Sequence, residues 1–204
     1  MLKNFDKEFL NEKVSFIAGC DEAGRGPLAG PVVVGACVMP LQDDKIIEGI
    51  NDSKKLTEKK REELYDMIIK TAISYSVSVV DNNVIDEINI LNATKLAMKN
   101  AINSLNCKVD LLLVDTVKNL DVNYNQVAII KGDAKSYNIA CASILAKVYR
   151  DRLMKELSEK YPVYEFAKHK GYGTKQHIEL LKKYGKCEIH RNSFIGNFIK
   201  VAKG

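Results

Sequence analysis

The 204-residue chain lacks tryptophan and contains only five cysteines and three histidines. The cysteines are odd in number and include no C-x-x-C pair, and the histidines include no H-x-x-x-H pair. These absences argue against a disulfide framework and against a zinc site. We therefore expect reduced thiols, as in a cytosolic protein.

A long apolar run is also missing. The longest such stretch, residues 32–39, is far shorter than the roughly 20 residues that a membrane-spanning helix requires. A secretory signal is excluded by charged residues that interrupt the N-terminal segment, namely Lys3, Asp6, Lys7, Glu8, Glu12 and Lys13. These features predict a soluble, cytoplasmic protein without a membrane partner, and the lack of a coiled coil favours a monomer.

Charge is unevenly distributed along the chain. The net charge is +5, but residues 168–204 carry nine Lys or Arg against two Glu, so residues 1–167 are slightly acidic. A basic tail beside an acidic body suits a polyanionic partner. The alternative is a solvated lysine-rich surface, which charge alone would favour.

Five short runs rich in Val and Ile predict strands at residues 14–19, 32–39, 74–80, 109–114 and 127–130. The first two are close enough to pair as a hairpin, and helical patterns alternate with the rest. This order indicates an α/β fold with a mixed five-stranded sheet flanked by helices. We assign residues 1–161 to the core and residues 162–204 to a basic C-terminal helical subdomain packed on it, within a single structural domain.

Apolar side chains at spacings of three and four predict three helices. Thr57 can cap the first, the second includes residues 93–105, and the third runs from about residue 136 to residue 160, before Pro162. The side chains expected to face inward are Leu64, Met67, Ile68, Ala93, Leu96, Ala97, Ala101, Leu105, Ile139, Ala142, Ala146, Tyr149, Leu153 and Leu157.

The most informative segment is residues 20–27 (CDEAGRGP), which follow the first predicted strand. Its adjacent acids, Asp21 and Glu22, are costly beside a core unless a cation satisfies them. Glycines on both sides of Arg25 let backbone N–H groups approach a ligand closely. Carboxylates for a metal next to bare backbone for a sugar or a phosphate indicate phosphodiester chemistry.

Two further acids follow predicted strands. Asp115 ends the run at residues 109–114, and Asp133 lies between the last strand and the third helix, where an acid alone would more often be an N-cap. Open α/β sheets gather ligands at the carboxyl ends of strands, so these acids are expected to converge with Asp21 and Glu22. Four carboxylates would repel one another unless a divalent cation joined them, and oxygen ligands suit Mg²⁺ or Mn²⁺. The pattern fits a two-metal site for phosphodiester hydrolysis.

Several segments together resemble the ribonuclease HII family. Residues 21–26 (DEAGRG) are similar to its signature, and further segments match in the same order, namely residues 52–56 (DSKKL), 131–136 (KGDAKS), 142–151 (ASILAKVYRD), 170–177 (KGYGTKQH) and 190–194 (HRNSF). The resemblance spans about residues 16–194. It implies a ribonuclease H-like fold and cleavage of RNA within RNA–DNA duplexes, including the 5′ side of a single ribonucleotide embedded in DNA, with 3′-hydroxyl and 5′-phosphate ends.

The resemblance also implies roles for individual residues. The catalytic, metal-binding carboxylates would be Asp21, Glu22, Asp115 and Asp133. Gly24, Arg25 and Gly26 would contact the ribonucleotide and its 2′-OH, largely through backbone groups, and Tyr172 would stack on the sugar of the following deoxynucleotide.

Ser53, Lys54 and Lys55 are expected to hold a phosphate, with an ordinary solvated turn as the alternative. For Arg25 the alternative is a structural salt bridge. Further phosphate contacts are expected among Lys170, Lys175, Lys182, Lys183 and Arg191, whereas the three histidines are expected to be structural or to lie near a phosphate, and not to be metal ligands. One position departs from the family, which commonly has glycine where this chain has Thr116. A β-branched residue restricts the backbone there and could shift the Asp115 carboxylate.

Three alternative functions remain open from the sequence. Ribonuclease HIII shares the fold and the acids, but typically has lysine where Arg25 stands and an extra N-terminal domain. A non-catalytic nucleic-acid-binding module would use the basic tail but gives no reason for four acids at strand ends. A glycosidase would need Asp21 and Glu22 to flank one bond, although adjacent strand residues point to opposite faces.

Overall fold

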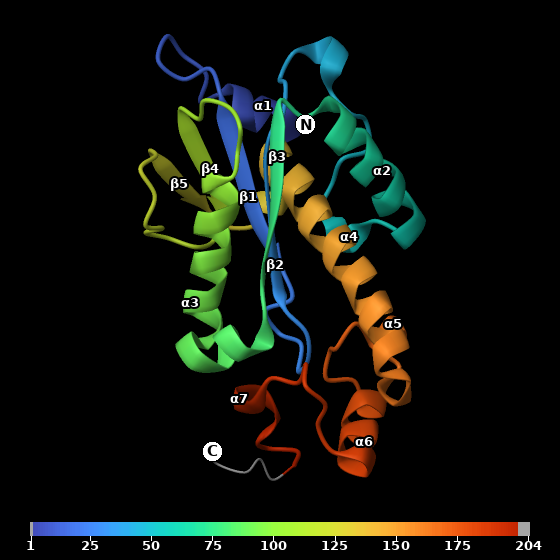
Figure 1. Cartoon of the computed structure of the whole chain (residues 1–204). Coiled ribbons are helices and arrows are strands. Elements are labelled where there is room, and N and C mark those ends of the chain that lie inside the picture. The colour runs from blue at the N-terminus through green and yellow to red at the C-terminus, as the bar shows by residue number, and fades with distance from the viewer. Residues whose placement is uncertain (1, 200–204) are drawn as a thin grey trace.

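The computed structural model describes residues 2–199. Its centre is a five-stranded mixed sheet with the strand order β3-β2-β1-β4-β5 (Figure 1). Strand β2 is antiparallel to both of its neighbours, β3 and β1, whereas β4 and β5 run parallel to β1. The strands are β1 (Ile17–Ala23), β2 (Val32–Val38), β3 (Ser74–Val80), β4 (Leu111–Asp115) and β5 (Gln126–Ile129). The α/β class, the mixed sheet of five strands and the predicted β1–β2 hairpin are confirmed.

The part of the chain at residues 2–199 contains seven α-helices. They are α1 (Leu2–Lys7), α2 (Glu58–Thr71), α3 (Asn82–Asn103), α4 (Tyr137–Lys160), α5 (Phe166–His169), α6 (Lys175–Tyr184) and α7 (Asn192–Ile195). Thr57 caps α2 as expected, because its side chain accepts from Lys60 N, and Ser136 caps α4 in the same way through Ile139 N. None of these helices is long and apolar enough to cross a membrane.

The two faces of the sheet carry different helices (Figure 1). Alternate residues of β2, such as Val34 and Ala36, pack into a core with α3, while Cys37 packs into a second core with α2 and α4. Burying each large aliphatic side chain in such cores contributes roughly 1.5–3 kcal/mol. Helix α4 approaches β1 and β2 closely because Gly19 and Gly35 face it. A Cβ at Gly19 would lie 2.1 Å from the backbone of α4, and one at Gly35 would lie 2.4 Å from it.

Several sequence expectations need correction. Strand β1 begins at Ile17 and extends to Ala23, so Asp21 and Glu22 lie within it and not after it. Helix α3 starts at Asn82, well before the predicted apolar stripe. A kink at Asn89 (φ 66°) breaks the apolar period, so the sequence pattern does not reveal the first turns of this helix. Three side chains expected to face inward lie at the edges of their helical stripes and are exposed, namely Met67 (44%), Leu96 (38%) and Tyr149 (39%).

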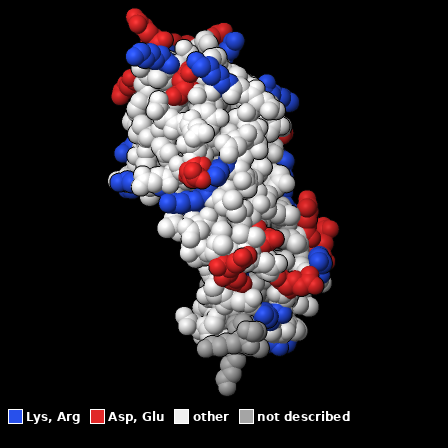
Figure 2. Space-filling model, turned by 60° about the vertical axis from the view of Figure 1, so that its left-hand side comes forward, with Lys and Arg blue, Asp and Glu red and all other residues white. Residues whose placement is uncertain are grey.

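The C-terminal helices α5, α6 and α7 lie beyond the ends of β2 and β3, at the lower end of Figure 1. They contact the loop between β1 and β2: Gly30 N donates to Ile189 O at 2.8 Å, and Leu28 N donates to Gly171 O at 2.8 Å. On the face shown in Figure 2, Lys and Arg form small groups interspersed with Asp and Glu and separated by wide uncharged areas. The basic excess of the tail therefore gives no continuous basic surface on that face.

Candidate active site

The topology brings three acid-bearing segments to one edge of the sheet. Strands β1 and β4 are parallel and pair Cys20 with Val114, so the next residues, Asp21 and Asp115, follow side by side. Strand β5 runs parallel to β4 and leads into the short 3-10 helix η3 (Gly132–Ala134), which carries Asp133. Parallel strands place their carboxyl ends at the same edge, which explains why residues far apart in sequence meet here.

Burial and the proximity of other acids change the pKa values of Asp21, Glu22 and Asp133. Asp21 is only 5% exposed, and its pKa is raised well above the usual range by burial, then by the charges of Glu22, Asp115 and Asp133. Burial also raises the pKa of Glu22, against the opposing charge of Arg25. The pKa of Asp133 is raised by burial and by the charges of neighbouring acids. Negative charge is therefore concentrated and poorly hydrated at this edge.

Cations and backbone donors already face some of these carboxylates. Asp115 Oδ1 accepts from Gly132 N at 2.6 Å, and Lys54 Nζ lies 3.6 Å from Asp133 Oδ2. Although burial opposes it, the pKa of Lys54 is raised by the surrounding carboxylates, with Asp133 the largest contributor. Arg25 forms an ion pair with Glu22 (Nη1 to Oε1, 3.4 Å), as the salt-bridge alternative anticipated.

The donor set fits a hard divalent cation. The buried Oε2 of Glu22 has no hydrogen-bond partner, which is a costly state that a cation would relieve. All four acidic side chains offer oxygen ligands, the type preferred by Mg²⁺ and Mn²⁺. As placed within residues 2–199, no three His, Cys, Asp or Glu side chains form a ready-made metal site. Asp115 and Glu22 are instead turned toward Gly132 and Arg25.

Thr116, directly after Asp115, has a left-handed backbone with φ 58°. That conformation is unusual for a β-branched residue, and a glycine would adopt it without strain. The Thr116 hydroxyl donates to Asp115 Oδ1 at 3.3 Å, so this carboxylate oxygen has two donors. The expectation that Thr116 affects Asp115 therefore has a structural basis.

The two glycines around Arg25 have different environments. Gly24 is buried with φ 96°, and a Cβ there would lie 2.1 Å from Arg150 Nε, so its glycine is required by packing. Gly26 is exposed, and a Cβ there would meet nothing within 4 Å. Only Gly26 therefore leaves open space on the outer side of the loop, as the close approach of a ligand requires.

Tyr172 lies on a loop that is hydrogen-bonded to the β1–β2 loop. Its side chain is 42% exposed, and its ring lies 5.7 Å from the guanidinium carbon of Arg150. The preceding residue, Gly171, accepts from Leu28 N. An exposed aromatic ring is thus fixed beside the glycine-containing loop.

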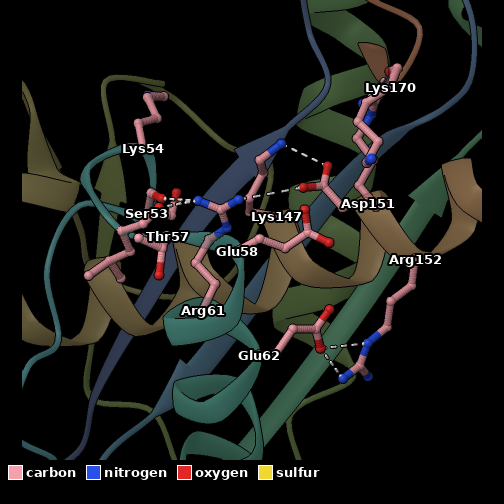
Figure 3. A network of polar contacts seen from close by, with 12 residues as sticks. Ser53, Lys54, Thr57, Glu58, Arg61, Glu62, Lys147, Asp151, Arg152 and Lys170 are labelled. Atoms are coloured by element: carbon pink, nitrogen blue, oxygen red, sulfur yellow. Dashed lines mark hydrogen bonds and ion pairs between the residues drawn. The ribbon is translucent and has the colours of Figure 1, made fainter. Parts of the chain in front are cut away.

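The Ser53–Lys54 segment forms a 3-10 helix, η2 (Ser53–Lys55), and Ser53 is buried. Arg61 of α2 holds this segment by donating to Ser53 O at 2.9 Å and to Leu56 O at 2.6 Å (Figure 3). The same guanidinium lies 3.9 Å from Asp151, which also pairs with Lys147 at 2.7 Å (Figure 3). Sequence reasoning missed Arg61, whose position in a polar helical turn carries no signal of these contacts.

Arg191 is not the surface phosphate contact that the sequence suggested. It is 0% exposed, and its guanidinium donates to the carbonyls of Gly30, Arg25 and Gly24. Arg150, also buried, makes the same kind of contacts. Both were missed as internal residues because arginine in a pattern of apolar spacing is normally assigned to the surface.

The three histidines form a buried cluster near these arginines. His177 Nδ1 donates to Tyr172 O at 2.9 Å, which leaves its Nε2 to accept from His190 Nε2 at 3.1 Å. His190 Nδ1 then accepts from Cys187 N at 2.9 Å. His169 stacks on His177 with ring centroids 4.4 Å apart. Every ring is neutral in this arrangement, and burial lowers the pKa of both His177 and His190 to about 4.

The strand order and the mixed strand directions define a ribonuclease H-like fold, in which acids lie in the last residues of β1, at the end of β4 and after β5. A family model described as Ribonuclease HII matches residues 18–197. The chain belongs to the ribonuclease HII family, and it is an endoribonuclease of ribonuclease H type 2.

Individual relatives agree with this assignment. The ribonuclease HII of Caldicellulosiruptor bescii is 62% identical over 96% of this chain and 94% of its own length. Ribonuclease H2 from Pyrococcus horikoshii superposes with a TM-score of 0.74 at 32% identity, covering 92% of this chain and 100% of that chain. RNase HII from Archaeoglobus fulgidus, solved in complex with PCNA, has a TM-score of 0.76 at 28% identity, covering 91% and 98%.

A more distant structure, Bst-RNase HIII in complex with Mn²⁺, shares the fold with a TM-score of 0.66 at 18% identity, covering 85% of this chain and 64% of that chain. The family match and the 62% identity favour ribonuclease HII over the ribonuclease HIII alternative.

Proposed function

We propose that this enzyme hydrolyses the RNA strand of RNA–DNA hybrids and cuts 5′ of single ribonucleotides embedded in duplex DNA, leaving 3′-hydroxyl and 5′-phosphate ends. The observation that supports it most directly is the concentration of Asp21, Glu22, Asp115 and Asp133 at one sheet edge, where burial and the charges of neighbouring acids raise the pKa values of Asp21, Glu22 and Asp133. A non-catalytic nucleic-acid-binding module would gain nothing from this arrangement, because buried acids repel phosphate.

The four carboxylates would hold Mg²⁺ or Mn²⁺, which supplies an activated water and stabilises the developing charge at the scissile phosphate. Before an ion binds, the protein itself holds two of these ligands. Asp115 accepts from Gly132 N and Glu22 pairs with Arg25, so both side chains would turn from these partners toward the ion. Lys54, whose side chain is mostly exposed beside Asp133, is free to turn toward a substrate phosphate.

Recognition of the ribonucleotide would use the loop at Gly24, Arg25 and Gly26. The 2′-OH is the group that distinguishes RNA from DNA, and an exposed backbone can contact it at close range. Tyr172, exposed beside this loop, would stack on the sugar of the following deoxynucleotide and so read an RNA-to-DNA junction.

The test is incubation of the protein with an end-labelled DNA duplex that contains one ribonucleotide, with and without Mg²⁺ or Mn²⁺. We expect a single cut on the 5′ side of the ribonucleotide that EDTA abolishes. Metal-independent cleavage, or a cut at another position, would contradict the proposal. Binding without any cleavage in either metal would instead favour the binding-module alternative.

A further inference from the structure

Two buried arginines contact the loop between β1 and β2, residues 24–31, which we call the recognition loop. Neither arginine forms an ion pair with a carboxylate among the described residues. Arg150 and Arg191 are 1% and 0% exposed, and no acid within residues 2–199 forms a salt bridge with either. Their guanidinium groups donate only to backbone carbonyls. The acceptors of Arg191 are Gly24 O (2.6 Å), Arg25 O (2.9 Å) and Gly30 O (2.9 Å), and those of Arg150 are Pro31 O (3.0 Å), Lys170 O (2.9 Å) and Ala29 O (3.2 Å).

Burying two charged guanidinium groups in this way carries a large desolvation free energy. Burial, together with the charge of Arg150, lowers the pKa of Arg191 to about 9, which reports how poorly the charged form is solvated. Apolar residues of similar volume would fill the same space with no desolvation cost. Packing alone therefore does not explain why arginines occupy these two positions. The several N–H donors of each planar guanidinium do explain why the carbonyls of the loop point inward.

The inward carbonyls fix the direction of the neighbouring amides. All described peptide bonds are trans, and in a planar trans peptide the N–H points opposite to the carbonyl of the same unit. Since Gly24 O and Arg25 O point to Arg191, the N–H groups of Arg25 and Gly26 point away from it. Neither amide has an acceptor within residues 2–199, and Gly26 is exposed.

We infer that Arg191 is a positioning residue that turns the carbonyls of Gly24 and Arg25 inward, so that the N–H groups of Arg25 and Gly26 form a preset pair of donors for the ribose 2′-oxygen of the substrate. The inference rests on the proposed function, since it names how that loop is made ready. It assigns the contact to two backbone amides and not to the Arg25 side chain, which pairs with Glu22.

Arg150 links the recognition loop to the loop that carries Tyr172. Its guanidinium bonds to Ala29 and Pro31 on one side and to Lys170 on the other, and it lies near the ring of Tyr172. A single rigid group thus fixes the spacing between the two loops. Arg191 is itself fixed, because its N donates to Leu28 O at 2.8 Å and its neighbour His190 forms a β-bridge with Ala29.

The test compares two equilibrium affinities of Arg191→Lys. A lysine keeps the charge but has no planar fork, so it can hold only part of the three-carbonyl arrangement. In EDTA, which keeps the duplexes intact, binding is measured by fluorescence anisotropy for a duplex with one ribonucleotide and for the same all-deoxy duplex. We expect Arg191→Lys to reduce the preference for the ribonucleotide by about tenfold, the worth of one or two hydrogen bonds, with unchanged affinity for the all-deoxy duplex.

The matched control is Arg152→Lys on the exposed side of α4, where the arginine pairs with Glu62 (Figure 3). This variant should keep the wild-type preference. If Arg191→Lys loses thermal stability but keeps the preference, Arg191 is merely structural and the inference is wrong.

A second measurement needs no variant and applies even if Arg191→Lys does not fold. In the ¹⁵N-labelled wild-type protein, the amide resonances of Arg25 and Gly26 should shift more with the ribonucleotide duplex than with the all-deoxy duplex. Equal shifts would overturn the inference. Wild-type cleavage at the ribonucleotide together with equal shifts refutes only this inference, whereas a wild-type protein that neither cleaves nor distinguishes the duplexes refutes the proposed function as well.

Discussion

The backbone N–H of Gly132 donates a 2.6 Å hydrogen bond to Oδ1 of Asp115. This bond joins the end of β4 to the turn that carries Asp133, so two of the four acids are placed relative to each other by the protein itself. The same oxygen receives the hydroxyl of Thr116, whose backbone is left-handed. The candidate site therefore combines a short hydrogen bond with a strained neighbour, and the strain is accessible to mutation.

We predict that Thr116→Gly increases the free energy of unfolding by about 1 kcal/mol, since glycine relieves the left-handed strain of a β-branched residue but adds freedom to the unfolded chain. Urea denaturation measures the change. Thr116→Ala is the matched control, because it removes the same hydroxyl but keeps a Cβ at φ 58°, and it should give no gain. A loss of stability in the glycine variant would show that the Thr116 hydroxyl contributes more than the strain costs.

We predict that Asp21→Asn stabilises the metal-free protein by about 1 to 2 kcal/mol while abolishing cleavage, because it removes a buried charge from among like charges. The amide oxygen can still accept from Glu22 N. Thermal unfolding in EDTA gives the measurement, and Asp121→Asn, at an exposed acid paired with Lys99, serves as control. A variant less stable than wild type would mean that the Asp21 charge is well satisfied without metal.

We predict that Tyr172→Ala impairs cleavage at a single embedded ribonucleotide more than cleavage of a long RNA–DNA hybrid, since a ring that stacks on the following deoxynucleotide matters most at a junction. Initial rates on the two substrates give the comparison. Tyr184→Ala, which removes another exposed tyrosine, on α6, should leave both rates unchanged. Equal losses on the two substrates would refute a junction-reading role.

The neutral histidine chain predicts a pH dependence of stability. The pKa of His177 and of His190 is lowered to about 4 in the folded protein, whereas an unfolded histidine titrates near 6.5. Between these values the unfolded state binds more protons, so this contribution to stability is complete above about pH 6.5 and is lost as the pH falls toward 4.

His190→Gln tests this dependence. It removes one of the two groups, so the stability difference between wild type and variant should shrink as the pH falls from 7 to 5. Urea midpoints at several pH values measure it, and the wild-type comparison removes the opposite effect of the acids with raised pKa values. A difference that stays constant with pH would contradict the neutral assignment.

Much of the fold could be predicted from the sequence, because local composition indicates strands. The strand predicted at residues 74–80, for example, has the same bounds as the observed β3. The acids were located because strand ends in parallel pairs must coincide. The roles of Arg150 and Arg191 were not predictable, since five of their six carbonyl partners lie 119 to 167 positions away in the chain. Gly24 illustrates the same limit. Its glycine was assigned to ligand approach, but its contact with Arg150 shows that packing requires it.

We propose that Asp133, with the other three acids, holds the ions that drive hydrolysis. The most direct measurement is the initial cleavage rate of Asp133→Asn on a duplex with one ribonucleotide in saturating Mg²⁺, alongside its affinity for that duplex. We predict a rate loss of at least about a thousandfold with nearly unchanged affinity, since the variant loses a carboxylate ligand but keeps the recognition loops. Turnover comparable to wild type would show that Asp133 does not hold a catalytic ion.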